Sequence, residues 1–338
     1  MKMKTQVCIT VDTEFSIGNK FDDYPTGYPL GEENVWCPVN GVSHGLGFLL
    51  ETFKRYEIEA TFFIEALHRH FFPEDPMRPL AHAIKNHGHE TQLHVHPLWS
   101  VLQHEDWYQR VSHHPRQDDF HGRASAESAA MITAGLEAFE AWSLPRPVLF
   151  RSGNLQHDAN LYQVLAAAGF RYASNIGLAV FNSGDPDYQL YSGLHMRAGV
   201  LECPVLSYSD WKIFGKKHLK TLTVIGSSDA EIRHLLLAAH ASRIPLVVIL
   251  THPFEYVVSK DDHLRDAQPN YAVQSRLRGL CEFLHENQDC FSAVGMARAL
   301  EGIPATQYGS NDLLATPLPH TIRRMVMQGM DHLARRIR

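Results

Sequence analysis

Paired cysteines are missing from this sequence. Its five cysteines stand far apart in the chain, and none forms a Cys-x-x-Cys pair. This spacing argues against a disulfide framework and against a zinc site built from thiolates. It favours a reducing compartment, so we expect a cytoplasmic protein.

Long apolar runs, an excess of positive charge and phosphate-binding loops are also missing. No stretch approaches the roughly 18 apolar residues of a membrane-spanning helix, and the basic amino-terminal residues are not followed by an apolar segment of signal-peptide length. The net charge of −6 gives no support to nucleic-acid binding. No Gly-x-Gly-x-x-Gly follows a predicted strand and no P-loop motif occurs, so nucleotide binding has no support either.

Apolar segments with strand and helix periodicity alternate along the chain. Of the 338 residues, 44% are hydrophobic, which is sufficient for a large core. The predicted strands are 6–11, 60–66, 91–95, 147–150, 171–174, 200–206, 246–250 and 291–294. The predicted helices are 42–57, 76–87, 125–142, 158–168, 230–241 and 270–286. Several strands are apolar on both faces, which is typical of parallel sheets covered by helices. The pattern predicts an α/β fold, and an incomplete β/α barrel fits it better than a doubly wound sheet.

The chain divides into one large domain and a short tail. Residues 1–305 are predicted to form a single domain, within which 15–41 make a long irregular loop such as a lid or substrate wall. Residues 306–318 are rich in Gly, Pro and Asn and are predicted to be a linker. Residues 319–338 form a basic amphipathic helix. This helix either packs back on the barrel or lies on an anionic membrane surface, at the inner face of the membrane.

Two histidines stand at the end of the predicted strand 91–95. Side chains at i and i+2 of an extended segment point the same way, so His94 and His96 are expected within about 7 Å of each other. Such a pair can hold a divalent metal. The alternative is a pair of histidines in a polar loop, in a chain that contains 22 of them.

Polar side chains follow the ends of other predicted strands as well. They are Asp12 and Glu14 after the first strand, Arg151 and Asn154 after strand 147–150, and His252 after strand 246–250. In β/α barrels the carboxyl ends of the strands face one rim, where active sites are built. These groups support metal-assisted hydrolysis. Two histidines and a carboxylate can bind an ion that activates water, and a second carboxylate can act as general base. A histidine can protonate the leaving group, and an arginine can orient the base.

Six short motifs occur in the order found in one known family. They are TVDTE at 10–14, EATFF at 59–63, GHE followed by LHVHP at 88–97, FRSGN at 150–154, AGFRY at 168–172 and LTHP at 250–253. On these motifs the chain resembles the polysaccharide deacetylase family (NodB homology, carbohydrate esterase family 4), as a divergent member. The resemblance implies a distorted (β/α)7 barrel and a metal-dependent hydrolase that removes acyl groups, commonly N-acetyl groups of amino sugars.

The resemblance also implies a role for each site residue. Asp12 would be the general base, Arg151 the residue that tethers it, and His252 the general acid that protonates the leaving amine. Glu14, His94 and His96 would bind the metal, for which zinc is expected, with nickel, cobalt or manganese as alternatives.

Two departures from the family pattern leave alternatives open. The family has metal-binding histidines four residues apart, but position 98 here is Leu98. His96 must therefore substitute, or His89 must join the site. Thr13 replaces the second aspartate of the family motif. Because i and i+2 converge at a strand end, we favour Asp12 as base and Glu14 as ligand, and the exchange of these two roles remains the alternative.

The expected substrate is an amino sugar, another glycan or a related amide. Asn154, Trp99 and Trp36 are the predicted substrate contacts, since aromatic side chains can stack on sugar faces. One alternative is a non-catalytic carbohydrate-binding barrel. Another is an iron oxygenase, because two histidines and one carboxylate also suit Fe(II), although such sites usually lie in all-β folds.

Overall fold

The computed structural model describes residues 4–18, 28–107, 109–110, 118–213, 215–261 and 263–337. For residues 213, 327–328 and 330–337 it describes the backbone alone.

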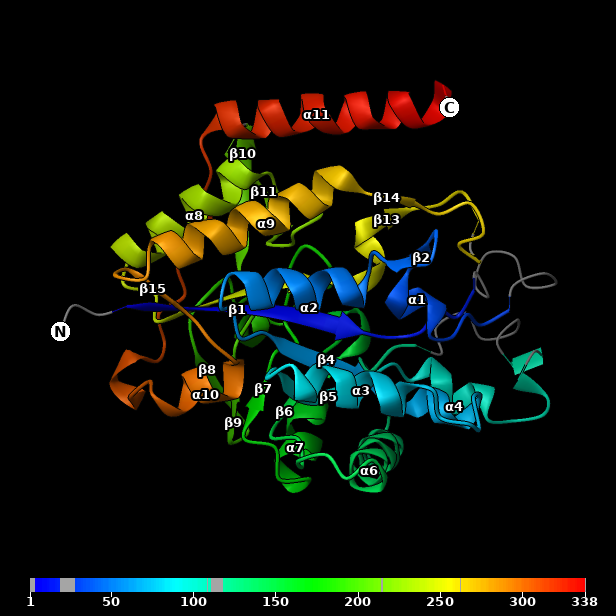
Figure 1. Cartoon of the computed structure of the whole chain (residues 1–338). Coiled ribbons are helices and arrows are strands. Elements are labelled where there is room, and N and C mark those ends of the chain that lie inside the picture. Colours follow the sequence, from blue (N-terminus) through cyan, green and yellow to red (C-terminus); the bar gives the residue numbers. More distant parts are fainter. Residues whose placement is uncertain are drawn as a thin grey trace.

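A curved sheet forms the centre of the molecule, with the strand order β12-β1-β4-β5-β6-β7-β9-β8 and with β15 paired to the start of β1 (Figure 1). Its strands are β1 (Thr5–Thr13), β4 (Thr61–Glu65), β5 (Glu90–Val95), β6 (Leu149–Ser152), β7 (Tyr172–Ala173), β8 (His195–Arg197), β9 (Val200–Glu202), β12 (Leu246–Thr251) and β15 (Phe291–Ala293). Within the described residues, the pairing of β8 with β9 is the one antiparallel pairing in this sheet.

The sheet curls toward closure. Single bridges join Val205 to Val248 and Thr223 to Leu250, so the chain beyond β9 reaches back to β12 at the other end of the strand order. All six residues of β12 are buried, as expected for a strand covered on both faces. The predicted α/β fold with a distorted, incompletely closed β/α barrel is confirmed.

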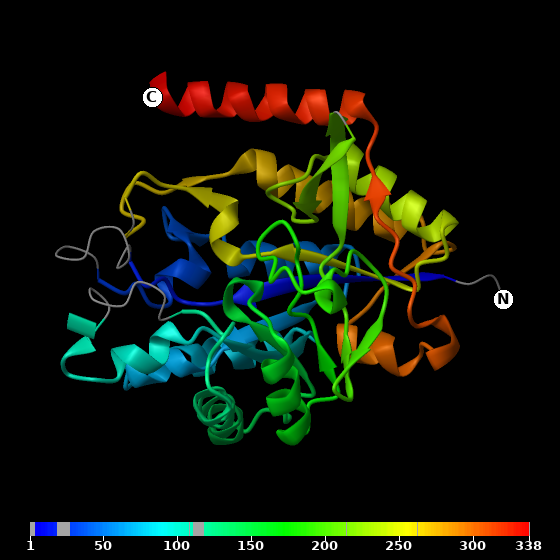
Figure 2. The ribbon, with the colours of Figure 1, turned by 180° about the vertical axis from the view of Figure 1, so that it is seen from behind.

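Helices follow most of the parallel strands and cover the sheet (Figures 1 and 2). The α-helices are α1 (Glu33–Trp36), α2 (Leu46–Arg55), α3 (Met77–Asn86), α4 (Leu98–Leu102), α6 (Ser125–Ala141), α7 (Ala159–Ala167), α8 (Asp229–Ala241), α9 (Tyr271–Glu286), α10 (Met296–Glu301) and α11 (Leu318–Ile337). Short 3-10 helices are η1 (Leu67–His70), η2 (Gly153–Leu155), η3 (Pro186–Tyr188), η4 (Pro253–Tyr256) and η5 (Ala305–Gln307). Figure 1 shows α2 and α3 beside the sheet and the pair α8 and α9 beyond β1.

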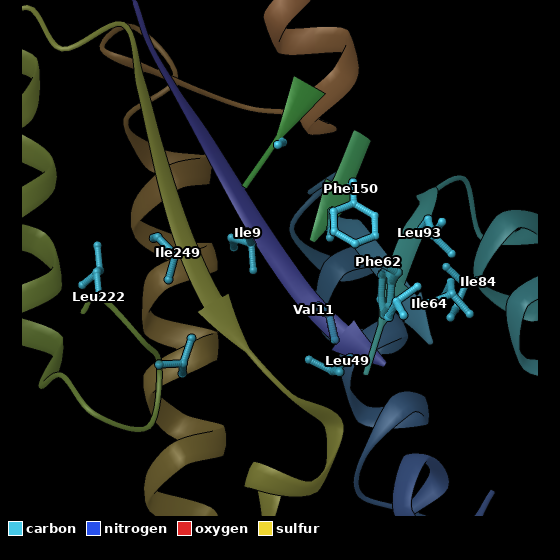
Figure 3. Packing of buried hydrophobic residues seen from close by; sticks show 14 of the residues in the cluster. Ile9, Val11, Leu49, Phe62, Ile64, Ile84, Leu93, Phe150, Leu222 and Ile249 are labelled. Atoms are coloured by element: carbon cyan, nitrogen blue, oxygen red, sulfur yellow. The ribbon is translucent and has the colours of Figure 1, made fainter. Parts of the chain in front are cut away.

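The core lies between the sheet and these helices. Figure 3 shows Leu49 of α2 and Ile84 of α3 beside the strand residues Phe62, Ile64 and Leu93, and all five are fully buried. Complete burial of such a side chain stabilises the fold by about 1.5–3 kcal/mol. The apolar residues whose spacing predicts these strands and helices are therefore also the residues that pack them together.

Several short elements were not predicted. Between 15 and 41 the described residues contain α1 and the strand β2 (Pro38–Val39). Strand β2 pairs with β3 (Val42–Ser43), so the helix predicted at 42–57 begins only at Leu46. Strands β13 (Val257–Val258) and β14 (Gln268–Pro269) form a further small ladder.

A second sheet has the order β11-β10-β16, and its strands are β10 (Ser207–Ile213), β11 (Lys216–Thr221) and β16 (Leu314–Ala315). The sequence of β11, KKHLKT, is polar and its first three residues are exposed, so it lacks the apolar alternation by which strands are predicted. Residues 306–318 were expected to be a linker. They contain β16, which pairs with β10, because backbone groups of the sheet edge offer hydrogen bonds that composition does not reveal.

Helix α11 is docked through its first turns. The buried side chain of Arg324 donates to Asp210 on β10 at 2.6 Å and to Glu231 on α8 at 3.0 Å. Leu318, Ile322, Met325 and Val326 are exposed. Figure 2 shows the helix continuing past the hairpin on which it packs. None of the helices in the described part of the chain is long and apolar enough to cross a membrane.

Candidate metal and catalytic site

The candidate site lies at the carboxyl ends of β1, β5, β6 and β12. His94 on β5 pairs in register with Arg151 on β6, and Val11 on β1 pairs with Thr251 at the end of β12. Because these strands are parallel, the polar residues at their ends meet at one rim of the barrel.

Arg151 is fully buried, and its hydrogen bonds hold the guanidinium group in one orientation. Its Nη1 donates to Oδ1 of Asp12 at 2.7 Å and to Oγ1 of Thr10 at 2.8 Å. Its Nε and Nη2 donate to the carbonyl and hydroxyl oxygens of Ser174, and the guanidinium lies 4.0 Å from the ring centroid of Phe63. The position of the Asp12 carboxylate is therefore set by a rigid cation.

His252 faces the other oxygen of the same carboxylate. Its Nε2 lies 3.9 Å from Oδ2 of Asp12, and its Nδ1 lies 2.8 Å from Oε1 of Glu255. Thr251 donates to the second oxygen of Glu255 at 2.7 Å, and the ring of Phe254 stacks on His252. Burial lowers the pKa of His252, but the hydrogen bond and charge of Glu255 outweigh it and raise the pKa to about 9. Near neutral pH this histidine carries a proton that it can donate.

Glu14, His94 and His96 converge at one point. The Oε2 atom of Glu14 lies 2.7 Å from Nε2 of His96 and 3.4 Å from Nε2 of His94. The two imidazole rings are 4.9 Å apart, as the i, i+2 spacing predicts. Among the described residues, these three side chains form the one group of three or more His, Cys, Asp or Glu residues whose ligand atoms all lie within 4.8 Å of one another.

The donor set fits a divalent cation. His94 Nδ1 lies 2.9 Å from the carbonyl oxygen of Arg151, and a carbonyl can only accept, so the proton is on Nδ1 and Nε2 is free for a metal. Two ligand atoms at about 2.1 Å from a zinc ion lie roughly 3.4 Å apart. The distance between His94 and Glu14 matches this value, and the distance between His96 and Glu14 is shorter by a few tenths of an ångström. Two histidines and one carboxylate leave a coordination position open for water.

The ionisation of these groups is strongly coupled. Burial lowers the pKa of His96, but the charges of Asp118 and Glu14 raise it well above 6.5. Burial raises the pKa of Glu14, and the two histidines outweigh this and lower it well below 4.5. A bound cation would take the place of the proton that His96 and Glu14 share.

Three carboxylates of this site were not predicted: Glu255 beside His252, Asp118 and Glu65. Asp118 accepts a hydrogen bond from Nδ1 of His96 at 2.7 Å. Glu65, at the end of β4, accepts from the backbone N–H of Leu67 at 2.6 Å and also from that of His96. Its position as the last residue of an apolar strand is a signal that could have identified Glu65. No spacing in the sequence connects Asp118 to the site.

The alternative ligand His89 is not part of the site. It lies at the opposite end of β5, where its Nδ1 accepts a hydrogen bond from the backbone N–H of Ala60 and its ring packs against Phe53 and Phe62.

A cavity of about 270 Å³ adjoins the metal-ligand group. Its lining includes Glu14, His96, Trp99, Asp118, Asn154 and Phe254. Of the predicted substrate contacts, Trp99 and Asn154 therefore face this cavity. Trp36 is half-buried, packs against the core and is not among the lining residues that the structure describes. A larger cavity of about 570 Å³ lies between η1, α4 and α6, and its described lining contains none of the predicted site residues.

The pairing of His252 with Glu255 yields a measurable prediction. In Glu255→Gln the pKa of His252 is expected to fall from about 9, because the charge of Glu255 is lost while burial remains and the charges of Asp12 and Glu14 alone still raise the pKa. NMR titration of the His252 ring in the metal-free protein measures this midpoint. The raised pKa adds stability that is full below about pH 6.5 and is lost as the pH rises through about 9, so the variant should also lose stability at neutral pH. The exposed variant Glu286→Gln is the control, and an unchanged His252 midpoint in Glu255→Gln would refute the assignment.

The fold is similar to that of a Mycobacterium smegmatis protein provisionally named a polysaccharide deacetylase. The two share 19% sequence identity with a TM-score of 0.52, and the match covers 94% of this chain and 96% of that one. A family 4 carbohydrate esterase from Streptomyces lividans, solved with acetate, matches at 14% identity and a TM-score of 0.40, over 92% of this chain and 100% of that one. A family 4 acetyl xylan esterase from Clostridium thermocellum, solved with a cobalt ion, matches at 15% identity and a TM-score of 0.43, over 89% and 93%.

No protein-family model and no curated protein sequence matches the chain. The likeness to the Mycobacterium smegmatis structure thus supports the resemblance drawn from the sequence motifs at the level of the fold.

Proposed function

We propose that this protein is a metal-dependent hydrolase that removes an acyl group, most commonly N-acetyl, from a carbohydrate or a related amide. The observation that supports this proposal most directly is a convergence of two sets of groups. A ligand triad of Glu14, His94 and His96 lies at the same rim as a carboxylate and histidine that face each other, Asp12 and His252. A fold shared with a protein provisionally named a polysaccharide deacetylase agrees with this assignment.

Glu14, His94 and His96 would hold the ion, and zinc is the metal that suits the donor set best, with nickel, cobalt and manganese as alternatives. When bound, the metal would lower the pKa of water and polarise the acyl carbonyl group. Asp12, oriented by Arg151, would accept the proton of the attacking water. His252, protonated through its pairing with Glu255, would donate its proton to the leaving nitrogen or oxygen. The products are a carboxylic acid and the free amine or alcohol.

We propose that the substrate contacts come from the cavity beside the triad. Trp99 and Asn154 remain the proposed contacts because both line this cavity, and Trp36 has no observation in its favour. A glycan or amino-sugar substrate is part of the proposal.

Metal content is the experiment that tests this function first. After reconstitution with zinc, elemental analysis of the wild type is expected to give about one ion per chain, and Glu14→Ala, His94→Ala and His96→Ala are expected to lose it. His87→Ala is a matched control, since this exposed histidine precedes the same strand. A screen for acetate release from N-acetylated amino sugars follows with the loaded protein. A wild type that binds no metal would overturn the hydrolase.

The two rival functions give different results in the same experiments. A non-catalytic carbohydrate-binding barrel would bind sugars without releasing acetate, and it would have no use for the buried pairing of Arg151 with Asp12 opposite His252. An iron oxygenase would bind iron and consume oxygen. The β/α fold disfavours the oxygenase.

Contact with an anionic membrane stays a prediction from the sequence and is not part of the proposed function. The observed contacts of Arg324 dock the beginning of α11 on the protein itself. The cytoplasmic location also stays a prediction.

A further inference from the structure

His96 is the ligand that departs from the family spacing, and it lies one residue beyond the end of β5. Its backbone N–H donates to Glu65, but this contact does not orient the ring, which needs a partner of its own. We propose that Asp118 is the positioning residue that fixes the ring of His96 for metal binding. The inference rests on the proposed function, since it assumes that His96 binds a metal.

Three donors converge on the two oxygens of Asp118. Oδ2 accepts from Nδ1 of His96 at 2.7 Å and from the amide of Asn154 at 2.8 Å, and Oδ1 accepts from the backbone N–H of Leu98 at 3.0 Å. The residue is only 7% exposed. Its carboxylate thus ties the histidine to two separate segments, the 3-10 helix η2 after β6 and the start of α4. Since Nδ1 of His96 carries the donated proton, Nε2 is the atom left for a metal.

Gly153 also packs closely against the His96 ring, nearest to its Nδ1 atom. A Cβ atom at this position would lie 2.5 Å from Nδ1 of His96, so any side chain would displace the ring. The next residue, Asn154, has a left-handed φ of 53°, which is uncommon for a non-glycine residue. This conformation accompanies the hydrogen bond from its amide to Asp118. Asn154 therefore supports the same ring, in addition to lining the cavity.

Asp118 itself is not a metal ligand in this arrangement. Its oxygen lies on the Nδ1 side of His96, whereas the ligand atoms of Glu14 and His94 lie on the Nε2 side. A carboxylate that accepts from the far nitrogen of a metal-binding histidine typically contributes 10–100-fold to metal affinity. Asp118 would thus hold in place the histidine that serves as ligand where position 98 is Leu98.

The test compares Asp118→Asn and Asp118→Ala with the wild type and with Asp119→Asn, which makes the same charge change one residue away. An asparagine offers one oxygen to three donors, so even this conservative variant must lose part of the arrangement. Zinc affinity is measured by competition with a chromophoric chelator. We expect zinc binding weakened about 10–100-fold in both Asp118 variants and unchanged in Asp119→Asn.

A second measurement separates positioning from general structural damage. In the metal-free wild type, long-range NMR correlation of the His96 ring is expected to show Nδ1 protonated and hydrogen-bonded. Asp118→Ala should lose this signature while its backbone amide resonances away from the site stay those of the folded wild type. Wild-type zinc affinity in both Asp118 variants would overturn the inference and leave the proposed function intact. A wild type that binds no zinc would overturn both.

Discussion

Replacement of Asp12 by asparagine is expected to lower kcat for acyl release by about 10²–10⁴-fold while zinc stays bound. The amide keeps the shape of the carboxylate and can still accept a hydrogen bond from Arg151, but it cannot accept a proton from water. The measurement is single-turnover acetate release together with metal content on the same samples.

The matched variant is Glu14→Gln, which is expected to lose both zinc and activity because its Oε2 is the atom nearest to both ligand histidines. The pair of variants decides between the two assignments of the carboxylates. If Asp12→Asn lost the metal and Glu14→Gln retained it, the roles of base and ligand would be exchanged. The structure favours the first assignment, since Asp12 is bound by Arg151 and Glu14 is not.

Replacement of Arg151 by methionine is expected to lower the free energy of unfolding by about 3–5 kcal/mol. The side chain is fully buried, and its loss leaves the Asp12 carboxylate and two oxygens of Ser174 without their donor. Urea denaturation followed by circular dichroism measures this change.

Arg171→Met is the control for Arg151→Met. Arg171 also pairs with a carboxylate, that of Glu301, but half of its side chain is exposed, so its removal is expected to cost less than about 1 kcal/mol. Equal costs for the two variants would show that the Arg151 pair is no more important to the fold than a surface ion pair. Activity measured on the folded fraction of Arg151→Met should also fall, because Asp12 would no longer be held toward His252.

Local patterns in the sequence determined the barrel and the placement of Asp12, His94, His96 and His252 at its rim. Strand β12 is a continuous apolar run up to Thr251, and β1 is a nearly fully buried run rich in β-branched residues. Parallel strands of this kind have their carboxyl ends at one rim. The placement of Asp12 and His252 at those ends follows from strand boundaries alone. The close approach of His94 and His96 follows from the two-residue period of an extended chain.

Tertiary structure decided the features that depend on contacts between distant segments. Asp118 reaches His96 from a polar connection 22 residues away, and the pairing of Leu314 with Tyr208 turns a stretch that resembles a linker into part of a sheet. Neither contact can be predicted from residue periodicity. The contact of Asp118 is made by a single side chain, and the pairing of Leu314 is made by backbone groups that every sequence has.

The same distinction applies to the candidate substrate contacts. Trp36 lies in the predicted loop 15–41 and Trp99 follows the predicted strand 91–95. Both pack in or against the core, yet of the two it is Trp99 that is among the described lining residues of the cavity. A tryptophan suits either environment by its area and its single polar group, so its identity does not determine which one it occupies. The sequence by itself determined which chemical groups stand at the rim of the barrel, since strand period and strand ends are local properties. The folded chain decided which groups orient them and which aromatic residues face the cavity, because those depend on how distant segments pack.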